Sequence, residues 1–254
     1  DIAATAFGRL KSIMGDSAIG FMDMSDAILK VGVNSVATES EIINVSTQVS
    51  SIAAQAGFST KEIIGLSGAL ASVRVPPELS RGLITRVFGQ IDKAVNAGGT
   101  GLETLARISG TTSEQFKKNW GAEGSADLFN SFLKGIRDAG PAARSELESL
   151  GITSVRDLPV TLRLANAADS EGNVGELLTQ TLNDANAAAG ETQRQYTIMA
   201  DTVVGKLKIL GNNLLAFFDA AGSQGIGVFG GMIENVTKFV RNLTRSLDDA
   251  APVF

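Results

Sequence analysis

The sequence predicts an all-α fold, and three observations lead to this prediction. Apolar residues recur three or four positions apart in almost every segment, as they do on the buried face of an amphipathic helix. A hydroxyl residue followed three positions later by Glu or Gln, which is a signature of a helix start, occurs three times between residues 36 and 120. Strand signals are scarce, because the alternating stretch at residues 155–164 is short and is interrupted by Pro159.

The three helix-start signatures are expected to form capping boxes. The hydroxyl oxygen of an N-cap residue accepts from the third helical N–H, and the Glu or Gln accepts from the N–H of the cap itself. An apolar residue follows directly in each case. Phe58, just before the second cap, is expected to pack on Ile63 as a hydrophobic staple. The pairs are Thr38 with Glu41, Ser59 with Glu62, and Thr112 with Gln115.

Three successive helices are predicted between residues 39 and 97. Pro77 and Glu78 mark the start of the third, because proline suits the first helical position and an acid suits the first turn. Gly98 and Gly99 mark its end. The predicted buried faces are Ile42, Val45, Val49, Ile52 and Ala56, then Ile63, Leu66, Leu70 and Val73, then Leu79, Leu83, Val87, Ile91 and Val95.

Shorter helices are predicted at residues 102–108, 114–120 and 126–138, and a further helix from Pro141 to Gly151. Trp120, Phe129 and Phe132 have two readings, an exposed anchor for a partner or part of the core. Their helical spacing favours the core, either within one chain or between copies.

The composition changes near residue 185, where the Ala- and Asn-rich residues 183–190 are either a helix end or a hinge. We therefore expect a helical core region at residues 1–188 and a second region at residues 189–254. The second region reads as a long amphipathic helix at 196–218, a glycine-rich break at 222–231 and another helix at 233–247. Its apolar faces are Met199, Val203, Leu207, Leu210, Leu214 and Phe217, then Ile233, Val236, Val240, Leu243 and Leu247.

Composition excludes several classes of chemistry. The 254 residues carry a net charge of −5 and are 44% hydrophobic, which indicates a globular chain without a broad nucleic-acid-binding face. There is no cysteine and no histidine, so disulfides, thiolate metal sites, cysteine nucleophiles and serine–histidine triads are absent. The chain has no initiator Met and no secretory pattern in residues 1–10, and we expect it to be a piece of a longer polypeptide.

A set of short phrases occurs in a characteristic order along the chain. Together they resemble the core region of the tail tape measure proteins of long-tailed bacteriophages, over roughly residues 1 to 215. The phrases are Val-Ala-Thr-Glu at 36–39, Ala-Gln-Ala-Gly-Phe-Ser-Thr-Lys-Glu at 54–62, Leu-Ala at 70–71 with Pro-Glu at 77–78, Leu-Ala-Arg-Ile-Ser-Gly-Thr-Thr at 105–112, Glu-Gln-Phe at 114–116 before Trp120, Leu147 to Ile152, and Thr-Val-Val-Gly-Lys-Leu at 202–207 running to Asn-Leu-Leu at 213–215.

The resemblance implies a structural virion protein and no enzyme. Such proteins lie in the lumen of the phage tail tube, set its length, and leave ahead of the genome at infection, when some contact the host membrane. An α-helix advances about 1.5 Å per residue, so helical length can serve as a ruler. The many Gly and Pro breaks here favour compact helical hairpins at an end of the ruler, by the tail tip. The implied partners are further copies of the chain, with a trimer as the first expectation, the tail tube protein, and the distal tail and tail-tip hub proteins. Host cytoplasm is the expected place of assembly.

Two motifs in the second region have rival readings. Residues 225–230 match the glycine pattern of dinucleotide-binding loops, but a helix and not a strand is expected before them, which favours a helix–helix hinge. The segment at residues 209–233 is long enough to cross a bilayer, which takes ~20 residues of helix. Asp219 and six glycines weaken that reading. The rival hypothesis is a membrane-active, pore-forming helical protein in which this segment inserts.

Charged residues give no catalytic, cofactor or metal site. Glu146 with Glu148, and Asp248 with Asp249, would point apart on a helix and are read as solvated faces. Lys117, Lys118, Arg241 and Arg245 are read as surface charges and not as nucleic-acid contacts. No small-molecule substrate is predicted.

Overall fold

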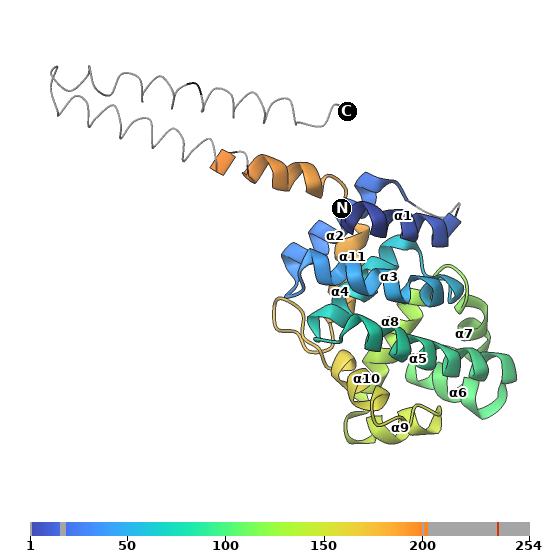
Figure 1. The fold of residues 1–254 in the computed structure, drawn as a ribbon. Helices are drawn as coiled ribbons and strands as arrows, with labels where there is room; N and C mark the ends of the chain where they lie inside the picture. The colour runs from blue at the N-terminus through green and yellow to red at the C-terminus, as the bar shows by residue number, and fades with distance from the viewer. Residues whose placement is uncertain (1, 16–18, 200, 203–237, 239–254) are drawn as a thin grey trace, which may run out of the picture. The chain divides into compact units, whose positions relative to one another are not determined.

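The computed structural model describes residues 2–15, 19–199, 201–202 and 238 (Figure 1). The chain divides into two units, Asp1–Glu191 and Thr192–Phe254. Most of the predictions for the second unit lie outside the described residues. These are the apolar faces beyond residue 202, the segment 209–233, the glycine motif at 225–230, Arg241, Arg245, Asp248 and Asp249.

The all-α prediction is confirmed for the part of the chain that the structure describes. Its regular elements are helices, and one isolated antiparallel bridge joins Ala168 to Val174. Residues 191–199 are also helical. The helices of the first unit are α1 (Ile2–Met14), α2 (Phe21–Asn34), α3 (Glu39–Gln55), α4 (Thr60–Ser72), α5 (Pro77–Ala97), α6 (Gly99–Ile108), α7 (Ser113–Asn119), α8 (Ser125–Asp138), the 3-10 turn η2 (Gly140–Ala142), α9 (Ala143–Ser149), α10 (Asp157–Ala165) and α11 (Leu177–Asn186).

All three predicted capping boxes are present, at the starts of α3, α4 and α7. At α4, the backbone N–H of Ser59 donates to Glu62 Oε2 at 2.7 Å, and the N–H of Glu62 donates to Ser59 Oγ at 3.3 Å. Pro77 is the first residue of α5, and Gly98 ends that helix with φ of 69°, as predicted. The starts of α3, α4, α5 and α7 could therefore be predicted from residues close together in the sequence.

Four helices end in the same hydrogen-bonded motif, the Schellman motif. In each, the residue after the C-cap has positive φ, and the next N–H reaches back five residues to a carbonyl, as in Val75 N to Leu70 O at 3.1 Å. Glycine supplies the positive φ at the ends of α3, α6 and α9, through Gly57, Gly110 and Gly151. At the end of α4 the same position is Arg74, with φ of 59°.

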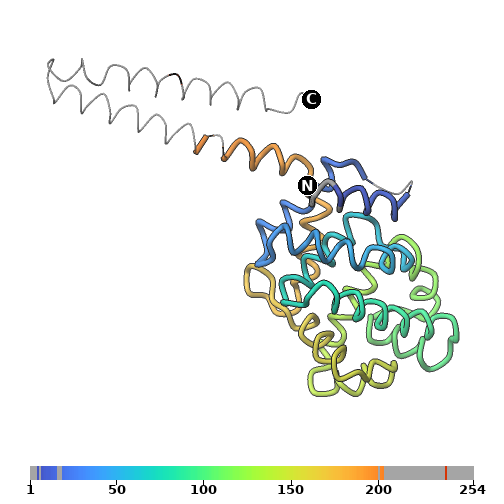
Figure 2. The backbone as a smooth tube through the Cα atoms, viewed as in Figure 1, coloured from blue at the N-terminus to red at the C-terminus, as the bar shows by residue number. Residues whose placement is uncertain are grey.

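Helix α4 is the central element of the first unit. It packs on α3, α2 and α11, so its buried residues surround the helix and do not form one face. Gly65 permits the close approach of α11, because a methyl group there would lie 2.9 Å from the Cα of Leu182. Figure 2 shows α11, from the end of the first unit, running among the early helices. The N-terminal and C-terminal parts of this unit therefore share one core.

A cluster of aromatic side chains forms another part of the core. Phe88 of α5 contacts Phe58, Trp120 and Phe129 at ring-centroid distances of 5.0 to 5.3 Å. Trp120 and Phe129 are 7% and 2% exposed, and Phe132 is fully buried, which confirms the core reading of these aromatics. The Trp120 indole N–H donates to Asp92 Oδ1 at 2.6 Å, so its polar atom is satisfied.

Leu79 is a corrected prediction, because it is 48% exposed and does not belong to the buried face of α5. A series spaced by four residues turns about 40° around the helix at each step, so its first member rotates off the face that holds its last. Ile84 and Phe88 complete the buried face. Ile52 of the α3 series is only partly buried.

Two further differences between the sequence analysis and the structure concern prolines. The alternating stretch at residues 155–164 is mostly helix α10, because its buried Leu158, Thr161 and Leu164 follow helical spacing and Pro159 falls in the first turn. Pro141 lies in the 3-10 turn η2, and α9 begins two residues later at Ala143.

Candidate functional site

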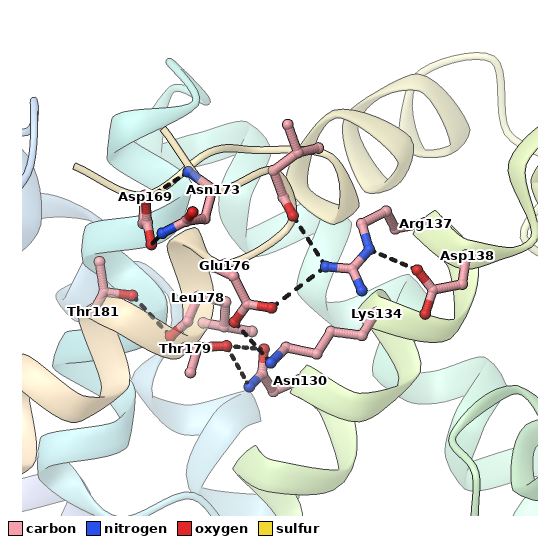
Figure 3. Close-up of polar contacts among 11 residues, drawn as sticks. Asn130, Lys134, Arg137, Asp138, Asp169, Asn173, Glu176, Leu178, Thr179 and Thr181 are labelled. Carbon is pink, nitrogen blue, oxygen red and sulfur yellow. Dashed lines mark hydrogen bonds and ion pairs between the residues drawn. The ribbon is translucent and has the colours of Figure 1, made fainter. Parts of the chain in front are cut away.

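A polar cluster joins helix α8 to the loop before α11, and it is the candidate functional surface of the first unit (Figure 3). Asn130, Lys134 and Arg137 are spaced by four and three residues on α8, so they share one helix face. Lys134 Nζ lies 2.7 Å from Glu176 Oε2, and Arg137 Nη1 lies 3.4 Å from Glu176 Oε1. Glu176 therefore links two cations of α8 to the start of α11.

Asp169 organises the loop between α10 and α11. Its Oδ1 accepts from the backbone N–H groups of Glu171 at 2.9 Å and Asn173 at 2.8 Å, and its Oδ2 accepts from Asn173 Nδ2 at 2.9 Å. Arg137 Nη1 donates to the carbonyl oxygen of Val174 at 3.0 Å, which attaches this loop to α8. The loop is therefore held by hydrogen bonds within itself, by Gln180 of α11, which bonds to Ser170, and by Arg137 of α8.

The electrostatics of the cluster favour ionised carboxylates. The pKa of Glu176 is lowered mainly by the hydrogen bond from Lys134, and that of Asp138 by the hydrogen bond from Arg137. The side-chain and backbone N–H groups of Asn173 lower the pKa of Asp169. Carboxylates in these environments accept hydrogen bonds from cations and amides, and they stabilise contacts between elements. Because their ionised forms are favoured, they are not proton donors at neutral pH.

Two of the pockets that border the first unit contrast in their lining. The smaller of the two, of about 400 Å³, is polar and is lined by Asp169, Glu171, Glu176 and Asp184. In the described part of the chain, no group of three or more carboxylates is arranged to hold a metal ion. The larger, of about 780 Å³, lies where the end of α1 meets α3 and the start of α4, and Ile13, Met14, Ala54 and Phe58 supply its apolar lining.

The charged residues singled out from the sequence that lie in the described part of the chain do not form one site. Glu146 pairs with Arg107 at 2.6 Å, whereas Glu148 pairs with Arg144 at 2.9 Å, so the two acids have different cations. Lys117 and Lys118 are exposed on α7.

The cluster around Glu176 was not anticipated from the sequence. The spacing of Asn130, Lys134 and Arg137 is a visible signal of a polar α8 face. Their partners are about 40 residues away in the chain, in a loop whose position depends on the packing of α11. No local pattern connects the two.

Comparison with known proteins identifies no relative: no protein-family model, curated protein or solved structure matches the chain. Of the helices that the structure describes, none combines the length and the apolar character required to cross a bilayer.

Proposed function

We propose that this chain is a structural fragment of a tail tape measure protein of a long-tailed bacteriophage. The observation that carries the proposal is the order and spacing of the phrases between residues 36 and 215. In this role the protein occupies the tail lumen or tail tip, contributes to tail length and tube assembly, and leaves the tail during genome ejection.

The construction of the first unit supports a scaffolding role. Helices α3 and α4 are closed at both ends, by a capping box and a Schellman motif, and most of the large aromatic side chains of the unit are used in the core. Most of its described ion pairs join one element to another, as Glu176 joins the start of α11 to α8. A component of this kind acts by shape and contact.

Self-association is the proposed mode of action. The apolar stripes at residues 196–218 and 233–247 have the spacing expected of an intermolecular helical bundle, and a tail with rotational symmetry places several copies on one axis. We propose a trimer, with the tube protein and the distal tail and tail-tip hub proteins as its neighbours.

Tail length is the direct test. In-frame deletions in the helical part of the full-length gene should shorten the tail by about 1.5 Å per residue removed, measured by electron microscopy of the particles. Point variants that keep the length, such as Leu79→Ser on the exposed start of α5, are the control and should leave the tail unchanged. Deletions that leave tail length unchanged in assembled particles would contradict the ruler role.

The rival reading, a pore-forming protein, rests on the hydrophobicity of residues 209–233. Purified chain mixed with dye-loaded liposomes distinguishes the two. A tape measure fragment should form discrete oligomers in solution without releasing the dye. Leakage that is abolished by charged substitutions in residues 209–233 would favour the rival.

A further inference from the structure

Helix α2 carries a polar stripe that holds the end of the first unit. Asp26, Lys30 and Asn34 are spaced by four residues, so they follow one side of the helix. Asn34 Nδ2 donates to Asp184 Oδ1 at 2.8 Å, and the carbonyl oxygen of Asn34 accepts from Gln180 Nε2 at 2.7 Å. These two contacts attach α11 to the last turn of α2.

The other two members of the stripe hold the last residues of the unit. Asp26 Oδ2 accepts from the backbone N–H of Gly190 at 2.7 Å, and Lys30 Nζ lies 3.7 Å from Glu191 Oε2. Asp26 and Glu191 are only 7% and 5% exposed. A buried carboxylate that loses its cation is costly, so the Lys30 contact constrains where Glu191 can lie.

The held residues form the turn that follows α11, residues 187–191, which we call the corner. Helix α11 ends at Asn186, and helical structure resumes at residue 191 after a short turn in which Gly190 has φ of 80°. Ala188 is 1% exposed, so the turn is packed as well as hydrogen-bonded. The division between the two units falls immediately afterwards, between Glu191 and Thr192.

We propose that Asp26 and Lys30 of α2 are a latch on residues 187–191, and that this corner opens as one local step when the latch breaks. The Ala- and Asn-rich residues 183–190, for which the sequence predicts a helix end or a hinge, then lead into a turn that side chains of α2 hold in place. The proposal is independent of the tape measure role. In that role, the latch would control when residues 187–191, at the end of the first unit, become free to open.

Hydrogen exchange of the full 254-residue chain tests the latch. Asp26→Ala removes the acceptor for Gly190, and Lys30→Met removes the cation beside Glu191. Each substitution should raise the exchange rates of the backbone amides of residues 187–191 by about tenfold or more. The amides in the middle of α5 should keep their wild-type rates, because that helix packs mainly on α3 and α6.

Two further variants separate a latch from a general loss of stability. Asp26→Asn keeps a side-chain oxygen for the Gly190 N–H and should exchange nearly as the wild type does. Adding Glu191→Gln to Lys30→Met removes the carboxylate charge that Lys30 faced and should reverse part of the increase, which is the signature of a direct pair. Unchanged rates at residues 187–191, or an equal rise in α5, would overturn the proposal.

Discussion

Arg74 is the one non-glycine residue with positive φ in the part of the chain that the structure describes. It has φ of 59° in the Schellman motif that ends α4, a position where α3, α6 and α9 use glycine. A Cβ atom makes this left-handed conformation unfavourable by roughly 1–2 kcal/mol. The side chain is exposed, so the local structure tolerates the cost without gaining buried contacts.

Arg74→Gly should therefore stabilise the protein. Relief of the left-handed strain exceeds the added backbone entropy of the unfolded chain, and we expect a gain of about 0.5–1 kcal/mol in the free energy of unfolding. Urea denaturation followed by circular dichroism measures it.

The same motif offers the reverse substitution as a matched control. Gly110→Ala, at φ of 66° with open space around the position, should destabilise by about 1 kcal/mol. Gly57→Ala should cost more, because its methyl group would meet the backbone of Ala122 at 2.7 Å. A stability order other than Arg74→Gly, wild type, Gly110→Ala, Gly57→Ala would contradict this account of the helix ends.

At the scale of the elements, ion pairs and hydrogen bonds attach the loop before α11 to α8. Glu176 pairs with Lys134 and Arg137, and Arg137 also binds the carbonyl oxygen of Val174. The lowered pKa values of Glu176 and Asp169 mean that the folded loop favours their ionised forms. Their contribution to stability is present above the unfolded pKa and is lost as the pH falls through the folded pKa.

Acidification should therefore loosen this loop before the core unfolds. The amides of residues 166–176 should lose protection, relative to their intrinsic exchange rate at each pH, as the pH falls through the lowered pKa values of these carboxylates, while the amides of α4 keep theirs. Glu176→Gln should reduce loop protection already at pH 7 and make it less dependent on pH, because it removes one of the two carboxylates whose pKa is lowered. A loop that keeps its protection until the core itself unfolds would contradict the role assigned to these carboxylates.

At the scale of the whole first unit, α4 connects the early helices to the last one. Gly65 allows the backbones of α4 and α11 to approach, and Gly68 similarly accommodates Val31 of α2. Because α11 is about 110 residues beyond α4 in the chain, this contact closes the unit.

Gly65→Ala should destabilise the entire unit by about 1–3 kcal/mol, since the new methyl group forces α4 and α11 apart. Gly89→Ala is the control, because Gly89 lies inside α5 with no atom near the position of its missing Cβ. That substitution should stabilise by about 0.5–1 kcal/mol through helix propensity alone. Thermal unfolding measures both, and a Gly65→Ala protein as stable as the wild type would show that α11 does not close the core.

The features that could be read from the amino-acid order are those set within one or two helical turns. Helix starts and the helical class depend on neighbours three or four residues away. The starts are the caps at Thr38, Ser59 and Thr112 and the first residue of α5, Pro77. Such neighbours are adjacent whatever the rest of the chain does. The helical spacing of the aromatic residues likewise indicated burial correctly.

Features that join distant parts of the chain came from folding in three dimensions. The exposure of Leu79 depends on which side of α5 meets α3. The pairing of Lys134 with Glu176 depends on where α11 lies. The hydrogen bond between Asp26 and Gly190 joins residues 164 positions apart. Periodicity assigns a face to each helix, but it does not say which other helix covers that face. The packing of α4 against both ends of the first unit makes that choice, because it brings α2, α3 and α11 into one core.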